Sequence, residues 1–301
     1  MVGEFAWIWI VLLAAAAQTV RNTAQKNLTQ TTGTLAATSV RFIYGLPFAI
    51  AALIAMRLIS QGPAPLANFT FTAWVSLGAV AQLVATALLL MGMQRRSFVI
   101  AVAYSKTEVL QVALFSLLLL GEAVAGSSVL AIVVASAGVL MLSVNPNAIR
   151  NGDGWLSSSA LLGVCSGAGF AISAVGYRGA ALALGPMPPW LAGAYTLVWA
   201  QTIQSVLIGG YLAWRDRAAL RAIAQAWRVS LLAGLAGSLA SFGWFTAFAM
   251  RNAADVRTLA LVEVLYGYVV SRRLFKEKIS VQETMGIALL IIGMVIITSH
   301  L

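Results

Sequence analysis

Apolar runs alternate with short polar segments along the whole chain of 301 residues. Each run has about the length that a helix needs to cross a bilayer. The segments between the runs carry proline, glycine or charge, as in "QGPAPLANF" and "WRDRAALRAIAQAW", which a spanning helix would avoid. The pattern predicts an all-α integral membrane protein with ten transmembrane helices, near residues 5–25, 33–56, 70–93, 98–120, 125–143, 157–177, 189–213, 229–250, 256–272 and 281–299.

Composition agrees with a membrane protein and limits the partners. Hydrophobic residues make up 60% of the chain and charged residues 9%, with a mean hydropathy of +0.90, whereas a soluble domain needs a more charged surface. The net charge of +10 is expected in the loops of such a protein, where it sets orientation. We therefore expect a lipid bilayer as partner and no nucleic acid.

The fourth and ninth predicted helices resemble copies of one sequence. A shift of 155 residues superposes 97–143 on 252–298, and two of the identical pairs are glutamates, Glu108/Glu263 and Glu122/Glu277, from a chain with six glutamates. We predict two five-helix repeats, 1–146 and 157–301, joined by an inter-repeat loop at 147–156. Because five is odd, the second repeat would enter the membrane inverted.

The basic residues test this inversion. One set of alternate loops holds twelve of them, and the other holds four, namely Arg57, Arg178, Arg251 and Arg257. By the positive-inside rule the first set is cytoplasmic, which leaves both termini on the periplasmic side.

Polar residues at mid-depth of the repeated helices are the main candidates for substrate binding or gating, since inverted repeats commonly bind substrate near the midplane. Tyr104, Glu108 and Gln111 share one face of the fourth helix. Glu263 and Tyr266 have similar depth on the ninth. Lys106 lies two residues from Glu108, about 200° around the helix, so these two residues are not expected to form a local ion pair.

Two interpretations of the glutamates stay open. They could line a wet cavity, bind an amino group or a proton, and change partners during transport. They could instead be neutral, or tied to Arg21, Arg41 or Lys106, and hold the two halves together.

Three further candidates come from other predicted helices. Gln18, Arg21 and Asn22 form a polar stripe on the first helix, which is either a solvated helix end or part of the site. Arg41 has a carboxylate partner or binds a substrate carboxylate. Trp244 lies deep and lines an apolar pocket, faces lipid or packs in the core.

Motifs and residue types that the sequence lacks exclude several kinds of chemistry. The chain has no GxxxxGK[ST] loop for nucleotide hydrolysis. Its one histidine is His300, so no metal site, cofactor or histidine base is expected. A membrane-embedded enzyme that acts on a lipid-linked substrate through paired carboxylates is the alternative to a transporter.

The ten spans, the repeat and the "LLLGE" that closes the fourth helix resemble the drug/metabolite transporter superfamily, EamA type. Gly121-Glu122 with Gly138 match the family pattern in the first half, and Glu277 with Gly286 and Gly293 match it in the second. Within the superfamily the chain is similar to bacterial inner-membrane exporters of aromatic and other amino acids. The chain departs from the family pattern in one respect, because many relatives carry proline at the positions of Glu108 and Glu263.

The resemblance implies a helical basket around a central cavity, with helices 1–4 and 6–9 lining it. It further implies a secondary transporter, not an enzyme, that exports amino acids or similar small amphipathic metabolites, or other metabolites or drugs, across the bacterial inner membrane by alternating access. A monomer is plausible for such a protein.

Overall fold

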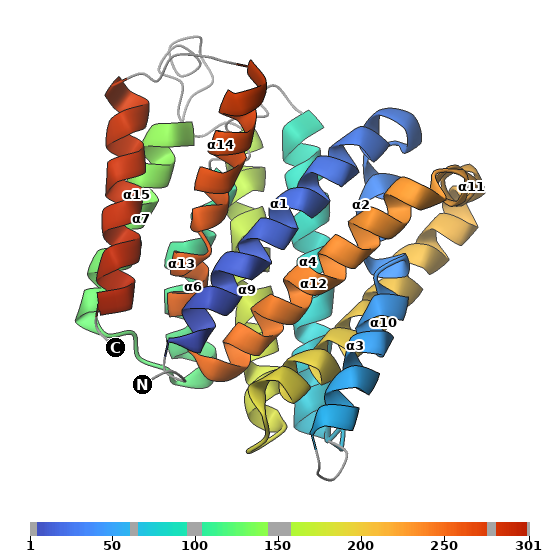
Figure 1. Ribbon diagram of the computed structural model, residues 1–301, viewed down its shortest axis with the longest axis horizontal. Helices are drawn as coiled ribbons and strands as arrows, with labels where there is room; N and C mark the ends of the chain where they lie inside the picture. The colour runs from blue at the N-terminus through green and yellow to red at the C-terminus, as the bar shows by residue number, and fades with distance from the viewer. Residues whose placement is uncertain (1–4, 61–65, 95–103, 144–157, 276–280, 300–301) are drawn as a thin grey trace. The chain divides into compact units, whose positions relative to one another are not determined.

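The computed structural model describes residues 5–60, 66–94, 104–143, 158–275 and 281–299, and these residues form α-helices without any strand (Figure 1). The predicted inter-repeat loop at 147–156 and the basic segments around 95–96, 150 and 276–278 lie outside the described residues. The helices are α1 (Ala6–Thr32), α2 (Thr34–Ile43), α3 (Leu46–Ile59), α4 (Phe69–Gln94), α6 (Glu108–Leu120), α7 (Gly126–Ser143), α9 (Ser158–Ala183), α10 (Pro189–Arg215), α11 (Arg217–Gln225), α12 (Trp227–Met250), α13 (Ala253–Leu259), α14 (Val262–Phe275) and α15 (Val281–Ser299).

Six helical segments of the described chain are long and apolar enough to cross a membrane: Thr34–Ile59, Phe69–Gly92, Ala160–Ala183, Pro189–Arg215, Trp227–Met250 and Val281–Ser299. Two shorter apolar helices, Glu108–Leu120 and Gly126–Leu142, accompany them. These helices indicate a multi-pass membrane protein. The predicted number of ten spans stays a prediction.

Several predicted boundaries are wrong. Helix α1 continues to Thr32 rather than ending near residue 25. In its polar end the hydroxyl groups of Thr29 and Thr32 each donate to the carbonyl four residues earlier, at 2.9 Å, so both hydroxyls are paired within the helix. Helix α11 lies where a loop was expected. The fourth and ninth predicted spans are each interrupted, as described below.

The chain forms two compact units, each described here by itself. Unit 1 comprises the described residues of Met1–Ile8, Ala81–Val175 and Asn252–Leu301, and unit 2 those of Trp9–Val80 and Gly176–Arg251. Helices α4 and α9 contribute residues to both units. Each unit therefore combines segments from both halves of the sequence. The division into repeats at 1–146 and 157–301 stays a prediction.

Helices α7 and α15 pack closely in unit 1, because glycines remove the side chains between them (Figure 1). A Cβ atom on Gly138 would lie 2.7 Å from the carbonyl oxygen of Gly286, and one on Gly293 would lie 2.7 Å from Cβ of Ala135. Gly138 and Gly293 occupy equivalent positions of the predicted repeat. Each of these glycines thus allows α7 and α15 to approach closely.

Buried amides hold the core of unit 2. Helix α10 packs against α12, α3 and α2. Gln201 Nε2 donates to Ser238 Oγ at 3.1 Å, and that hydroxyl donates to the carbonyl of Gly45 at 2.7 Å. Gln204 Nε2 donates to the Tyr177 hydroxyl at 3.2 Å. These contacts satisfy polar groups that hydrocarbon would otherwise leave unpaired.

Candidate functional site

Both helices of the predicted repeat are broken directly before their shared glutamate. The first breaks at Lys106–Thr107, and α6 starts at Glu108. The second breaks at Ala260–Leu261, and α14 starts at Val262, one residue before Glu263. At each break the hydrogen bonds shorten to a three-residue spacing, from Thr107 N to Tyr104 O at 3.2 Å and from Glu263 N to Ala260 O at 3.0 Å.

Each glutamate therefore lies in the first turn of a helix inside unit 1. Backbone N–H groups at the start of a helix point towards such a residue, and the helix dipole stabilises negative charge there. The helix start thus offsets part of the cost of burying a charged carboxylate at each break.

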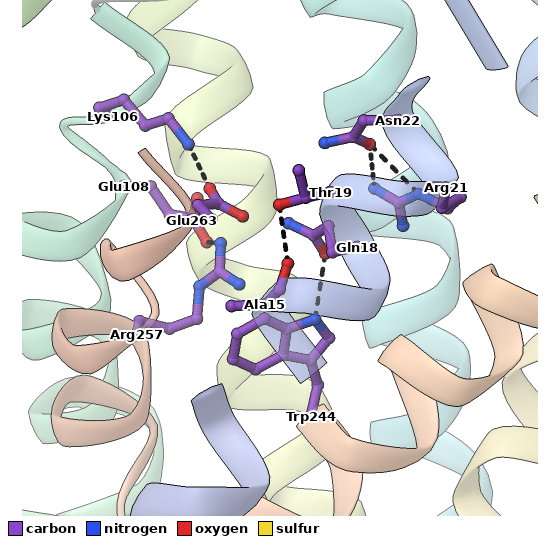
Figure 2. A network of polar contacts seen from close by, with 10 residues as sticks. All are labelled: Ala15, Gln18, Thr19, Arg21, Asn22, Lys106, Glu108, Trp244, Arg257 and Glu263. Atoms are coloured by element: carbon purple, nitrogen blue, oxygen red, sulfur yellow. Dashed lines mark hydrogen bonds and ion pairs between the residues drawn. The ribbon is translucent and has the colours of Figure 1, made fainter. Parts of the chain in front are cut away.

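Two ion pairs join the broken helices, and we call them the crossed ion pairs (Figure 2). Lys106 Nζ lies 2.5 Å from Glu263 Oε1, and Arg257 Nη2 lies 2.5 Å from Glu108 Oε1. Each glutamate is paired with a cation from the other half of the sequence. The four charges sum to zero, so the cluster holds two carboxylates in an apolar unit without a net charge.

The two pairs differ in exposure. The side chains of Glu108 and Arg257 are 6% and 17% exposed, whereas those of Glu263 and Lys106 are 14% and 24% exposed. The more exposed pair has easier access to water or to a small solute.

Helix α9 supports the first break from one side. A Cβ atom on Gly167 would lie 2.9 Å from the carbonyl oxygen of Ser105 and 3.1 Å from the backbone nitrogen of Glu108. Only a glycine lets the backbone of the break approach α9 so closely. Ser166 Oγ in turn donates to the carbonyl of Ala85 at 2.8 Å, which ties α9 to α4 within unit 1.

Helix α13, which carries Arg257, begins at a reciprocal cap. Asn252 Oδ1 accepts a hydrogen bond from the backbone nitrogen of Asp255 at 2.8 Å, and Asn252 Nδ2 donates to Asp255 Oδ2 at 3.1 Å. This satisfies a backbone donor at the helix start. The cap sets where α13 begins, and so which face carries Arg257 towards Glu108.

The remaining candidates of the repeated helices lie close to the breaks in sequence. Gln111 Nε2 donates to Thr107 Oγ1 at 2.9 Å and to the carbonyl of Val164 at 3.4 Å. Tyr104 lies one turn before the first break, and Tyr266 lies on α14 three residues after Glu263; both are partly exposed. Gln111 thus has a role in holding the first break to α9.

The prediction that Lys106 and Glu108 do not pair locally is confirmed, because each pairs with a residue of α13 or α14. The pairing of Glu263 with Lys106 agrees with the structural interpretation. The placement of Arg257 in a loop is wrong, and so is that of Arg178. Arg257 lies in α13, and Arg178 lies in α9, where Nη1 donates to the carbonyl of Phe248 at 2.8 Å.

Arg257 is therefore a site residue that the hydropathy pattern missed. Arg257 is the second residue of the predicted span 256–272, and this position at the edge of the apolar run led to its assignment to a loop. The sequence "NAAD" at 252–255 does contain a signal for the start of α13, because an asparagine followed three residues later by an acid is typical of a helix start.

The other predicted candidates lie in unit 2. Trp244 Nε1 donates to Gln18 Oε1 at 3.0 Å, and Arg21 Nη2 donates to Asn22 Oδ1 at 2.8 Å (Figure 2). Trp244 is buried. Gln18 of the stripe on α1 thus contacts α12, whereas Asn22 is exposed.

Arg41 lies in the last turn of α2. Its guanidinium carbon lies 4.3 Å from the ring centroid of Phe42. Gly237 of α12 would place a Cβ atom 3.2 Å from Cβ of Arg41 and 3.2 Å from Cδ of Arg21. Two arginine side chains therefore meet the same position of α12 in unit 2.

Comparisons with known proteins support the fold alone. No protein-family model matches the sequence, and no curated protein matches it. A solved structure described as "Crystal structure of protein" superposes with a TM-score of 0.70 over 98% of this chain and 98% of its own, at 15% sequence identity.

Proposed function

We propose that the protein is a secondary transporter of the EamA type within the drug/metabolite transporter superfamily. It exports amino acids or similar small amphipathic metabolites across the bacterial inner membrane by alternating access. In this proposal the chain crosses the membrane ten times as two inverted repeats, with both termini periplasmic. The six long apolar helices and two shorter ones support a polytopic protein of this kind.

The crossed ion pairs at the two helix breaks carry the proposal. Interrupted backbone and ionised side chains are costly in hydrocarbon and are retained where they line a water-filled path or a binding site. Discontinuous helices with opposed helix ends are the usual substrate and ion sites of transporters built from inverted repeats. Both features coincide in unit 1, at equivalent positions of the predicted repeat.

A zwitterion fits the charges of this site. Its ammonium group replaces a cation at Glu263 or Glu108, and its carboxylate takes the cation that is released, Lys106 or Arg257. Every charge then keeps a partner, and the net charge of the site does not change on binding. Tyr104 and Tyr266 are positioned by sequence next to the breaks and supply aromatic surface for an apolar side chain.

The exchange of ion-pair partners also gives a reason why the broken helices move during transport. With both pairs formed, the two broken helices are held together; with a substrate inserted into one pair, that link is replaced by two contacts to the substrate. The equilibrium between two arrangements of the helices then depends on the substrate, which is the requirement for coupled transport.

Transport into proteoliposomes tests the function. Purified protein is reconstituted, and the uptake of radiolabelled amino acids is followed as a function of concentration, with protein-free liposomes as the control. Saturable uptake supports a transporter, and non-saturable flux identifies a channel instead. Turnover of a lipid-linked substrate by protein in detergent, without uptake, would support the enzyme alternative.

A further inference from the structure

The segment between α10 and α12 forms the short helix α11 (Arg217–Gln225), outside the proposed transport site. Helix α10 ends at Arg215 and α12 begins at Trp227, and both are candidate membrane spans. Figure 1 shows α11 at the end where these two long helices are joined. The segment therefore lies where the chain leaves the hydrocarbon and enters the headgroup layer.

One face of α11 is fixed to the protein. Ala219 and Ile223, four residues apart, are buried. The carbonyl of Ile223 accepts hydrogen bonds from the Tyr44 hydroxyl at 3.3 Å and from Ser230 Oγ at 3.0 Å. These contacts, one from the end of α2 and one from α12, hold α11 in one orientation, so its opposite face is presented to the surroundings in a defined way.

The opposite face is basic. Arg217 and Arg221 are exposed and, at a spacing of four residues, share one side of the helix. The single acid of the segment, Asp216, is used as the helix cap, where Oδ1 accepts a hydrogen bond from the backbone nitrogen of Ala219 at 3.0 Å. The segment 214–228 holds four arginines and this one aspartate, so its exposed face has an excess of positive charge.

A Trp-Arg pair stands at each end of α11. The guanidinium carbon of Arg215 lies 4.8 Å from the ring centroid of Trp214, and that of Arg228 lies 5.4 Å from the ring centroid of Trp227. Both tryptophans are exposed, at 76% and 51%. Exposed tryptophan is typical of the membrane–water interface, where its ring enters the headgroup region.

We propose that α11 and its two Trp-Arg pairs bind the headgroups of anionic phospholipids at the membrane surface. The tryptophans set the depth of the segment, and the arginines bind lipid phosphates, to which a guanidinium donates two hydrogen bonds in a matching geometry. This binding is independent of whether the protein transports a solute.

Native mass spectrometry of the purified protein tests this proposal. Protein in detergent is titrated with phosphatidylglycerol or with phosphatidylcholine of the same chain lengths, and the bound lipid is counted. The wild type should prefer phosphatidylglycerol. Arg221→Gln/Arg228→Gln should weaken phosphatidylglycerol binding roughly 30-fold, since each arginine near an anionic surface contributes about fivefold. Phosphatidylcholine binding should be unchanged.

Two control variants separate charge at α11 from charge in general. Arg221→Lys/Arg228→Lys keeps the charge and should retain most of the preference. Arg57→Gln/Arg251→Gln removes the same net charge elsewhere in unit 2, and this variant should retain the full preference for phosphatidylglycerol. The proposal is overturned if the α11 variant and the matched control lose the same affinity, or if the wild type binds both lipids equally.

Salt gives a test that needs no variant. The preference of the wild type for phosphatidylglycerol should fall as ionic strength rises, because salt screens exposed charges. A preference that does not change with salt would contradict binding through the arginines.

Discussion

Glu108 Oε1 lies 2.5 Å from Nη2 of Arg257, and these two residues come from opposite halves of the sequence. Glu108 begins one broken helix, and Arg257 lies on the short helix before the other break. The second pair, Lys106 with Glu263, joins the same two breaks. Loss of one member leaves the opposite charge without its partner in an apolar unit, so disruption of either pair should lower the stability of the protein.

The first prediction concerns the relative stability of the two pairs. Glu108→Gln should lower the free energy of unfolding by about 3 kcal/mol, because it leaves Arg257 charged and largely buried. Glu263→Gln should cost less, about 1 kcal/mol, because Lys106 is more exposed and can extend its amine towards water. Thermal unfolding of both variants in one detergent measures the order.

A double variant serves as the control for this comparison. Glu108→Gln/Arg257→Gln removes both charges and should be more stable than Glu108→Gln alone. Equal losses for the two single variants, or a double variant as unstable as the sum of its singles, would contradict the account of the buried pair.

The second prediction concerns the contact of α9 with the first break. Gly167→Ala adds a methyl group 2.9 Å from the carbonyl oxygen of Ser105, closer than side-chain atoms approach, so the break must move. We expect a loss of about 1–3 kcal/mol in stability and a larger fractional loss of transport than of folded protein. A variant with unchanged transport and stability would show that the break tolerates displacement.

The third prediction concerns the packing of α7 on α15. Gly138→Ala places a Cβ atom 2.7 Å from the backbone of Gly286 and should cost about 1–3 kcal/mol. Gly126→Ala is the matched control, because a Cβ atom there meets no heavy atom within 4 Å. The control should change stability by less than about 0.5 kcal/mol. Equal melting temperatures for the two variants would refute the close packing at Gly138.

The fourth prediction concerns the cap of α13. Asn252→Ala removes the acceptor for the backbone nitrogen of Asp255 and should cost about 1 kcal/mol. Asn252→Ser keeps an oxygen acceptor and should retain most of that stability. The comparison is again made by thermal unfolding, and an Ala variant as stable as the Ser variant would show that the cap is not needed.

The sequence pattern predicted an all-helical membrane protein correctly, because burial in lipid imposes long apolar runs that are visible in the sequence alone. It also singled out Glu108, Glu263 and Lys106, since charge in such runs is rare. The prediction failed where helices break. Hydropathy averages over a window, so it joined the end of α13 to α14 in one predicted span and left Arg257 at the edge of that span, where the arginine was assigned to a loop.

Partners across the structure could not be predicted either. Lys106 and Glu263 are 157 residues apart in sequence, and the repeat relates Glu108 to Glu263 without relating Arg257 to Lys106. The basic half of each pair therefore has no counterpart in the other repeat. Which cation faces which glutamate depends on where the breaks fall, and these are set by backbone contacts such as those of Gly167 rather than by residue type.

The most direct measurement is the uptake of radiolabelled amino acids into proteoliposomes that contain wild type, Glu108→Gln or Glu263→Gln at equal amounts of folded protein. If the crossed ion pairs take part in transport, the wild type should show saturable uptake and both variants should lose it. Saturable uptake that is unchanged in both variants would contradict this role and leave the crossed ion pairs as packing contacts.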